Sequence, residues 1–326
     1  MNELNWQNHR AISHRRENRT MVKIRNLTKR FGHNLAVDHL SLDIREGEIF
    51  GLVGPNGAGK TTTLRMLACL IAPDEGQAYV GGFKIGAQSM AIRRMVGILN
   101  ESPGLYDKLS ARENLSLYAN LQEVSNPERQ IERYLRLLGL WERRDELTGS
   151  FSKGLRQKLA LARALIHEPR ILLLDEPTAA LDPKSARIVH DFIAEVKGEK
   201  RTVLICSHNL SEIEQLCDRV GLLNQSLIAV DRPKDLRHQL FGHKTVVGLR
   251  FVNPAIMETL QGLDFVQEVQ REDKNLIISL TDPENQTYIV VQRIVAAGGE
   301  IQSVGELQHP LEEVYLSLLE EDEEQS

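Results

Sequence analysis

The chain has 326 residues, of which 41% are hydrophobic, so it is long enough for roughly two domains and has the composition of a soluble globular protein. Its formal net charge of −5 gives no reason to expect nucleic acid as the main ligand, and no apolar run approaches the ~18 residues that span a bilayer. The cysteines Cys69, Cys206 and Cys217 are odd in number and widely spaced, which argues against a zinc site and predicts buried thiols in a reducing compartment.

The N-terminal part of the chain predicts a polar extension followed by short strands. Residues 1–20 are rich in Asn, Arg and His, and we expect them to form a disordered extension. Short apolar runs at Val22–Leu27, Leu40–Ile44 and Glu48–Val53 then predict β-strands. Glu46-Gly47 predicts a hairpin turn between the last two of these strands.

A glycine-rich segment follows and fits the pattern Gly-x4-Gly-Lys-Thr of a phosphate-binding loop. All three of its glycines are expected to allow turns that a Cβ atom forbids, so that successive N–H groups converge on phosphate oxygens. Lys60 would place a mobile positive charge on the β- and γ-phosphates, and the Thr61 hydroxyl would be a ligand of Mg²⁺. The helix predicted at Thr61–Leu70 would direct its N-terminal dipole at the anion. The predicted phosphate-binding residues are Gly54, Pro55, Asn56, Gly57, Ala58, Gly59, Lys60, Thr61 and Thr62.

The middle of the chain has a helical pattern, and residues 96–168 are expected to form a helical subdomain inserted into the first domain. Ser110 to Glu113 is a capping box, and Asn126-Pro127 offers an N-cap followed by proline at the first helical position. Beyond this insert, Ile171–Leu174 and Val203–Cys206 are short, unbroken apolar runs, as expected of parallel strands that are buried on both faces.

The C-terminal part predicts a second, smaller domain. The first domain, residues 21–232, ends with a hairpin formed by Val220–Leu223 and Leu227–Val230. Residues 233–243 are expected to be a linker. Residues 244–326 follow the β-α-β-β-α-β order of a small α+β domain of ferredoxin-like type and end in an acidic tail.

An acidic pair follows the first of the two buried strands. Asp175 emerges at the end of this strand, where a carboxylate can orient Mg²⁺. Glu176 follows at once and can polarise the water that attacks a γ-phosphate. A phosphate-binding loop alone leaves GTPases, kinases, helicases and transport ATPases open, so the acidic pair narrows the choice toward nucleotide hydrolysis.

A further motif lies between the loop and the acidic pair. Phe151 to Leu155 opens a helix, where the hydroxyl of Ser152 and the backbone of Gly154 would make a second anion site. With these motifs in this order, residues 21–230 resemble the nucleotide-binding subunits of ABC transporters, whose signature Leu-Ser-Gly-Gly-Gln is replaced here by Phe-Ser-Lys-Gly-Leu. Similar variants occur chiefly in exporters with separate membrane subunits. The resemblance implies an α/β P-loop NTPase of ABC type, with a mixed sheet core, an antiparallel β subdomain and a helical insert.

The resemblance also implies roles for residues outside these motifs. Phe31 stands where the family places the aromatic residue that stacks on adenine, although Phe31 could instead belong to the core. Glu101 replaces the glutamine that senses Mg²⁺ and is a predicted metal ligand together with Thr61 and Asp175, although it adds a negative charge near ATP. His208 resembles the switch histidine that contacts the γ-phosphate, and it joins Glu176 and Lys60 as a predicted catalytic residue.

The resemblance implies a mechanism with two chains. Ser152 should lie too far from its own Lys60 to touch the same nucleotide, so two chains, as a homodimer or a heterodimer, would enclose two ATP molecules head to tail. ATP and Mg²⁺ are the expected cofactors. ATP binding would close this dimer and hydrolysis would open it. At the cytoplasmic face of the membrane, this motion would power transport, in the export direction, through an integral membrane permease. The alternatives that stay open are a soluble ABC-type ATPase acting on ribosomes or DNA, a GTPase, and a regulatory protein that binds ATP without hydrolysing it.

Overall fold

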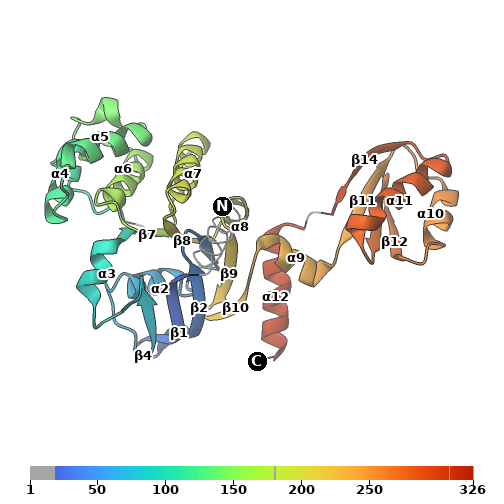
Figure 1. Ribbon diagram of the computed structural model, residues 1–326, viewed down its shortest axis with the longest axis horizontal. Helices are drawn as coiled ribbons and strands as arrows, with labels where there is room; N and C mark the ends of the chain where they lie inside the picture. Colours follow the sequence, from blue (N-terminus) through green and yellow to red (C-terminus); the bar gives the residue numbers. More distant parts are fainter. Residues whose placement is uncertain (1–18, 101, 180, 308, 326) are drawn as a thin grey trace, which may run out of the picture. The chain divides into compact units, whose positions relative to one another are not determined.

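The structure is a computed structural model that describes residues 19–100, 102–179, 181–307 and 309–325 (Figure 1). The chain divides into two compact units between Arg232 and Pro233, which is the boundary expected for the first domain. Each unit has its own hydrophobic core. None of the described helices is long and apolar enough to cross a membrane.

The first unit begins with an antiparallel sheet of four strands, in the order β2-β1-β4-β5. Alternate residues of β1, among them Val22 and Ile24, are buried on one face of this sheet, which is the period expected of a strand with one covered face. The four strands are β1 (Thr20–Phe31), β2 (Asn34–Arg45), β4 (Glu75–Val80) and β5 (Phe83–Lys84).

A sheet of six strands forms the centre of the first unit, in the order β10-β9-β3-β8-β7-β6. Strands β6, β7, β8, β3 and β9 run parallel to their neighbours, and β10 pairs antiparallel with β9. Because β3, β7 and β8 are buried along their whole length, their sequences are mainly continuous apolar runs, with polar residues only at the ends of β7 and β8. The strands are β3 (Ile49–Val53), β6 (Val96–Leu99), β7 (Ile171–Asp175), β8 (Thr202–Ser207), β9 (Arg219–Asn224) and β10 (Ser226–Asp231).

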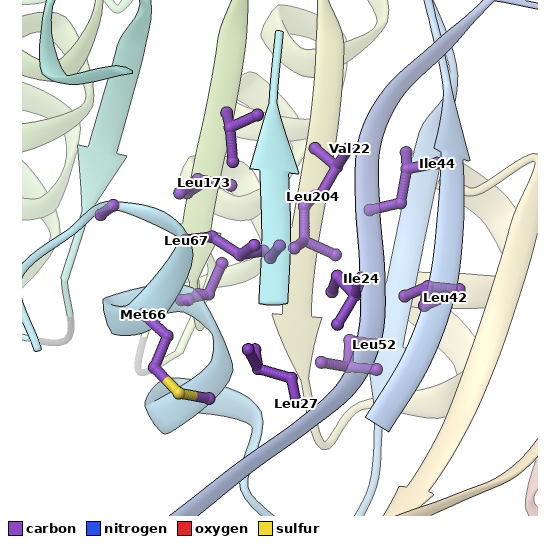
Figure 2. Close-up of a cluster of buried hydrophobic side chains, with 14 of the residues drawn as sticks. Val22, Ile24, Leu27, Leu42, Ile44, Leu52, Met66, Leu67, Leu173 and Leu204 are labelled. Carbon is purple, nitrogen blue, oxygen red and sulfur yellow. The ribbon is translucent and has the colours of Figure 1, made fainter. Parts of the chain in front are cut away.

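The core of the first unit lies between these two sheets and helix α2 (Lys60–Leu67) (Figure 2). Val22 and Ile24 of the antiparallel sheet contribute to the same buried cluster as Leu52 and Leu204 of the central sheet. Leu67 of α2 joins this cluster. The helix that begins at the phosphate-binding loop is therefore fixed by apolar packing along its length.

Three helices of the insert lie side by side, namely α4 (Ala111–Leu121), α5 (Pro127–Leu137) and α6 (Lys153–Leu165) (Figure 1). The predicted capping box is confirmed, because the Ser110 hydroxyl accepts from the backbone N of Glu113 and the Glu113 carboxylate accepts from the backbone N of Ser110. The described residues of this unit also form the α-helices α3 (Ser89–Met95), α7 (Pro183–Gly198) and α8 (Leu210–Leu216) and the short 3-10 helices η1 (Trp141–Arg143) and η2 (Thr148–Ser150).

Two local predictions are wrong. The turn at Glu46-Gly47 does not join a hairpin, because β2 and β3 belong to different sheets and β3 pairs with β8 and β9. Residues 96–99 form strand β6 rather than the start of the helical insert. A Cβ at Gly97 would lie 2.1 Å from the carbonyl oxygen of Ala164, so this strand packs closely against α6 only because a glycine stands there.

The cysteine prediction holds for two of the three residues. All three thiols are free. Cys206 and Cys217 are buried, and burial raises the pKa of both thiols well above the ordinary range. Cys69 is only partly buried, in the turn after α2.

The second unit contains a four-stranded antiparallel sheet in the order β12-β13-β11-β14. Residues 244–306 have the predicted β-α-β-β-α-β order, and Ile256 of α10 and Ile294 of α11 pack with Val247 and Ile278 of the sheet. The predicted linker is largely helix α9 (Pro233–Phe241). The other elements are β11 (Lys244–Leu249), α10 (Pro254–Gln261), β12 (Val266–Glu272), β13 (Asn275–Leu280), α11 (Pro283–Ala296), β14 (Ile301–Glu306) and α12 (Leu311–Gln325).

Candidate nucleotide-binding site

A pocket of about 430 Å³ lies where β1, β3, β7 and β8 end. Its volume is within the range of small-ligand sites, roughly 300–1,000 Å³. The parallel strands of the central sheet end at one edge, so residues far apart in the sequence meet there. The lining residues are Phe31, Asn34, Ala36, Asn56, Gly57, Ala58, Gly59, Lys60, Thr61, Thr62, Lys153, Gln157, Asp175, Glu176, Ala179 and His208.

The glycines of the loop serve two different purposes. Gly57 and Gly59 have φ values of 89° and 97°, in the left-handed region that favours glycine. A Cβ at Gly59 would also lie 2.3 Å from the carbonyl oxygen of Ala36. Gly54 has no such φ, but a Cβ there would lie 2.1 Å from the carbonyl oxygen of Leu223. The prediction that all three glycines allow special turns is therefore wrong for Gly54, which is needed because the loop passes close to β9.

Lys60 is buried inside the loop. Its Nζ donates to the carbonyl oxygens of Gly54 at 2.6 Å and Pro55 at 2.9 Å. Gly54 and Pro55 are not among the described residues that line the pocket, and their carbonyl oxygens bind the lysine instead. Helix α2 begins at Lys60 itself, one residue earlier than predicted. Lys60, Thr61 and Thr62 of its first turn line the pocket, so the unpaired N–H groups of this turn lie there together with the lysine charge.

Two oxygen ligands suited to Mg²⁺ lie side by side at the back of the site. The Thr61 hydroxyl donates to Oδ1 of Asp175 at 3.1 Å, and Asp175 is only 3% exposed at the end of β7. Hydroxyl and carboxylate oxygens are the donors that this hard cation prefers, so the residues present fit the predicted ion. The third predicted ligand, Glu101, lies outside the described residues.

Glu176 and His208 form a hydrogen-bonded pair at the pocket. Oε1 of Glu176 accepts from the backbone N of His208 at 3.1 Å, and Nδ1 of the same histidine lies 2.8 Å away, a geometry in which Nδ1 donates. Glu176 has a φ of 48°, a conformation that costs a non-glycine residue about 1–3 kcal/mol. The strand end and the loop after β8 together hold the carboxylate in this position.

Phe31 is a pocket residue and does not belong to the core. It stands at the end of β1, and it is 51% exposed. The ammonium of Lys29 lies 5.4 Å from the centroid of its ring. The ring therefore offers an accessible face for stacking, as the adenine assignment requires.

The signature segment begins α6. The Ser152 hydroxyl caps this helix by accepting from the backbone N of Leu155 at 3.4 Å. Lys153 lines the pocket of its own chain, whereas its neighbours Ser152 and Gly154 are not among the described lining residues. The pocket that contains Lys60 therefore includes Lys153 but, among the described residues, neither of the two predicted anion-binding residues.

Sequence reasoning missed the roles of two buried polar residues, one that lines the pocket and one that supports it. Gln157 of α6 donates from Nε2 to the carbonyl oxygens of Glu176 at 3.3 Å and Pro177 at 3.4 Å.

Glu212 of α8 is 4% exposed and accepts from the Thr178 hydroxyl at 2.6 Å. Nε2 of His190 lies 2.9 Å from the other carboxylate oxygen of Glu212. Gln157 belongs to the segment that follows the signature serine but was given no role, and Glu212 belongs to no motif. A polar residue on a buried helical face is the signal that could have identified both.

Glu212→Ala should lower the free energy of unfolding by about 1–3 kcal/mol, because the hydroxyl of Thr178 and the ring of His190 would lose a buried partner. Since Thr178 is two residues from Glu176, kcat for nucleotide hydrolysis should also fall. Thermal melts and steady-state kinetics on the same preparations separate the two effects. Glu195→Ala, an exposed acid on α7, is the matched control. A lower melting temperature with unchanged kcat would show that Glu212 has a structural role only.

Comparison with known proteins identifies the family. The family model described as ABC transporter matches residues 37–179. The chain is 41% identical over 217 residues to the bacitracin transport ATP-binding protein BcrA of Bacillus licheniformis, an alignment that covers 66% of this chain and 71% of that protein. The chain belongs to the ABC transporter family. The linearmycin resistance ATP-binding protein LnrL of Bacillus subtilis aligns with this ABC protein over 305 residues at 31% identity, which covers 91% of this chain and 98% of the relative.

Solved structures agree with this assignment. An ATP-binding subunit of an ABC transporter superposes with a TM-score of 0.64 at 28% identity, over 68% of this chain and 94% of that one. An ATP-binding cassette solved as a dimer in a post-hydrolysis state, bound to ADP and Pi, superposes with a TM-score of 0.61 at 28% identity, over 65% of this chain and 98% of that one. The ABC protein described here is accordingly an ATP-hydrolysing subunit.

Proposed function

We propose that this subunit powers export through a separate integral membrane permease by hydrolysing ATP at sites shared between two chains. The observation that carries the hydrolytic part is the Glu176–His208 pair, held at 2.8 Å in the pocket that contains Lys60. The export direction is supported by the names of relatives, which include a Nod factor export protein of Rhizobium etli that is 32% identical over 304 residues. That alignment covers 92% of this chain and 93% of the relative.

The predicted site residues that line the pocket each have a role in this proposal. Lys60 and the N–H groups of residues 57–62 bind the phosphates, and Phe31 stacks on the adenine. Thr61 and Asp175, with Glu101 as a further predicted ligand, would hold Mg²⁺, which when bound neutralises phosphate charge. Glu176 orients the attacking water and accepts its proton. His208 holds the Glu176 carboxylate and contacts the γ-phosphate. Catalysis then depends on positioning and charge neutralisation.

The second chain supplies the remaining anion site. Ser152 and Gly154, which are not among the described residues that line the pocket of their own chain, would contact the γ-phosphate of the nucleotide in the partner. The dimeric cassette with a TM-score of 0.61 supports this arrangement. A homodimer would have an isologous interface, with the same patch on both chains, and a heterodimer would place a related subunit opposite this one.

The permease assignment is supported by the relatives named for transport, resistance and export. In this proposal the subunit lies at the cytoplasmic face of the membrane, and the helical insert transmits the closing of the dimer to the permease. No nucleic acid partner is proposed.

The test is a detergent pull-down of tagged Glu176→Gln protein from its own cell type, in the presence of Mg-ATP. We expect a polytopic membrane protein to co-purify in stoichiometric amount, because the variant should remain in the ATP-bound dimer. Lys60→Ala, treated in the same way, should recover less of it, since this variant should not close around ATP. Recovery of ribosomal or DNA-associated proteins without a membrane partner would instead favour a soluble ABC-type ATPase.

A further inference from the structure

The second unit contains a cluster of histidine and carboxylate side chains that the ATPase reaction does not use. His238 is on α9, His243 lies between α9 and β11, and Glu306 is the last residue of β14. One ligand atom from each of the three residues lies within 4.8 Å of the others. The sequence brings Glu306 to the two histidines only through the pairing of β11 with β14, in which Thr245 lies opposite Glu306.

The separations within the cluster suit a tetrahedral metal ion. Nε2 of His238 lies 2.6 Å from Oε1 of Glu306, and Nδ1 of His243 lies 3.5 Å from the same oxygen. Zinc bonds of about 2.0–2.2 Å in tetrahedral geometry place neighbouring donor atoms roughly 3.3 Å apart, so small side-chain adjustments would bring all three onto one ion. The two imidazole rings are in contact, with centroids 3.7 Å apart and a tilt of 43°, so they would have to move apart for both nitrogens to bind one ion.

The cluster is also accessible. The side chains of His238, His243 and Glu306 are 25%, 48% and 44% exposed, and all three line one groove of about 670 Å³ in the second unit. An ion can therefore reach the cluster from solvent, and water in the groove can occupy a fourth coordination position.

The charges around the cluster are mixed, so a metal ion would be held by direct ligation and not by general electrostatic attraction. Lys234, Lys244 and Asp282 line the same groove, so the nearby charges do not by themselves concentrate cations. Affinity must come from direct ligation by two neutral imidazoles and one carboxylate. This donor set suits Zn²⁺ and its transition-metal neighbours, whereas Mg²⁺ and Ca²⁺ prefer shells made of oxygen alone.

We propose that His238, His243 and Glu306 bind one Zn²⁺ ion, with water in the fourth position. The ion would bind ligands from both α9 and β14. At this position the two elements are connected in the structure by the hydrogen bond from His238 to Glu306. Since a ligand that binds only the folded state stabilises that state, zinc should raise the melting temperature of the second unit.

The test is calorimetric titration of the purified, metal-free, full-length protein with Zn²⁺, in the presence of excess Mg²⁺ to occupy oxygen-ligand sites. We expect one strong binding event. His238→Gln/His243→Gln should weaken it by at least about tenfold, because even the loss of an outer-shell partner typically costs a metal site that much. His33→Gln, which changes an exposed histidine of the first unit, should have no effect.

Titration with Co²⁺ provides a second readout. Intense visible absorption bands would indicate tetrahedral coordination, and these bands should be absent in the double variant. If the double variant does not fold in the absence of metal, Glu306→Gln replaces it, because this change keeps the shape and removes the charged ligand. Unchanged zinc affinity in either folded variant, or no strong event in the natural protein, would overturn the proposal.

Discussion

Glu176→Gln should reduce the steady-state rate of ATP hydrolysis at least about a hundredfold, because general-base assistance typically contributes 10²–10⁴-fold. The amide keeps the size of the carboxylate, and its oxygen can still accept from the backbone N of His208, as Oε1 does now at 3.1 Å. What it loses is the ability to take a proton from water. Binding of ATP and closure of the dimer should therefore remain.

Two measurements on the same protein check this expectation. Phosphate release reports turnover, and size-exclusion chromatography with Mg-ATP reports dimerisation. Glu195→Ala, on the exposed face of α7 and not among the described residues that line the pocket, serves as the control for an unrelated loss of a carboxylate. Turnover in the Gln variant comparable to that of the natural protein would remove Glu176 from its catalytic role.

Ser152→Arg should abolish hydrolysis as a purified variant, because the longer cationic side chain would obstruct the nucleotide bound to the partner. Lys60→Ala should be equally inactive, since it removes the buried ammonium next to the phosphate-binding loop. A mixture of the two variants should nevertheless recover activity. In a mixed dimer, Lys60 of one chain and Ser152 of the other complete one intact site.

The size of the recovery can be estimated. Random pairing of equal amounts makes half of the dimers mixed, and each has one of its two sites intact, so independent sites would give about a quarter of natural activity. Dimer composition should be verified with two different tags. Ser150→Arg, which adds the same side chain two residues before the signature serine, should stay active and tests for general steric damage. Absence of any recovery in verified mixed dimers would count against shared sites.

The parts of the site that were predictable from sequence are those in which one short segment specifies both backbone and chemistry. The phosphate-binding loop carries its own glycines, its lysine and the start of α2, so Lys60 and Thr61 could be placed without knowing the rest of the fold. Asp175 and Glu176 could be placed because a run of buried apolar residues ends directly before them. Pocket residues Asn34 and Ala36 carry no such signal.

The errors and omissions have a common physical cause. The partner of a short apolar run is not specified by the run itself, so the sequence predicts a hairpin of β3 with β2 and a helical start at β6, whereas β3 and β6 both belong to the central sheet. The contacts of Gln157 and Glu212 join residues that are 19 and 34 positions apart in the sequence, so no local pattern indicates them. Likewise, the absence of cysteine pairs excluded one kind of zinc site but could not reveal histidines that approach Glu306 through a sheet.

Helix α6 has a consequence for communication between the two active sites. It starts at the residue that would contact the partner's nucleotide, and a little more than one turn later Gln157 is hydrogen-bonded to the backbone beside the catalytic carboxylate. A helix of this length moves as a rigid rod. A displacement imposed at one end, by arrival or loss of a γ-phosphate across the interface, would therefore be transmitted mechanically to the geometry of Glu176. Hydrolysis in one half of the assembly would then set the timing of the other.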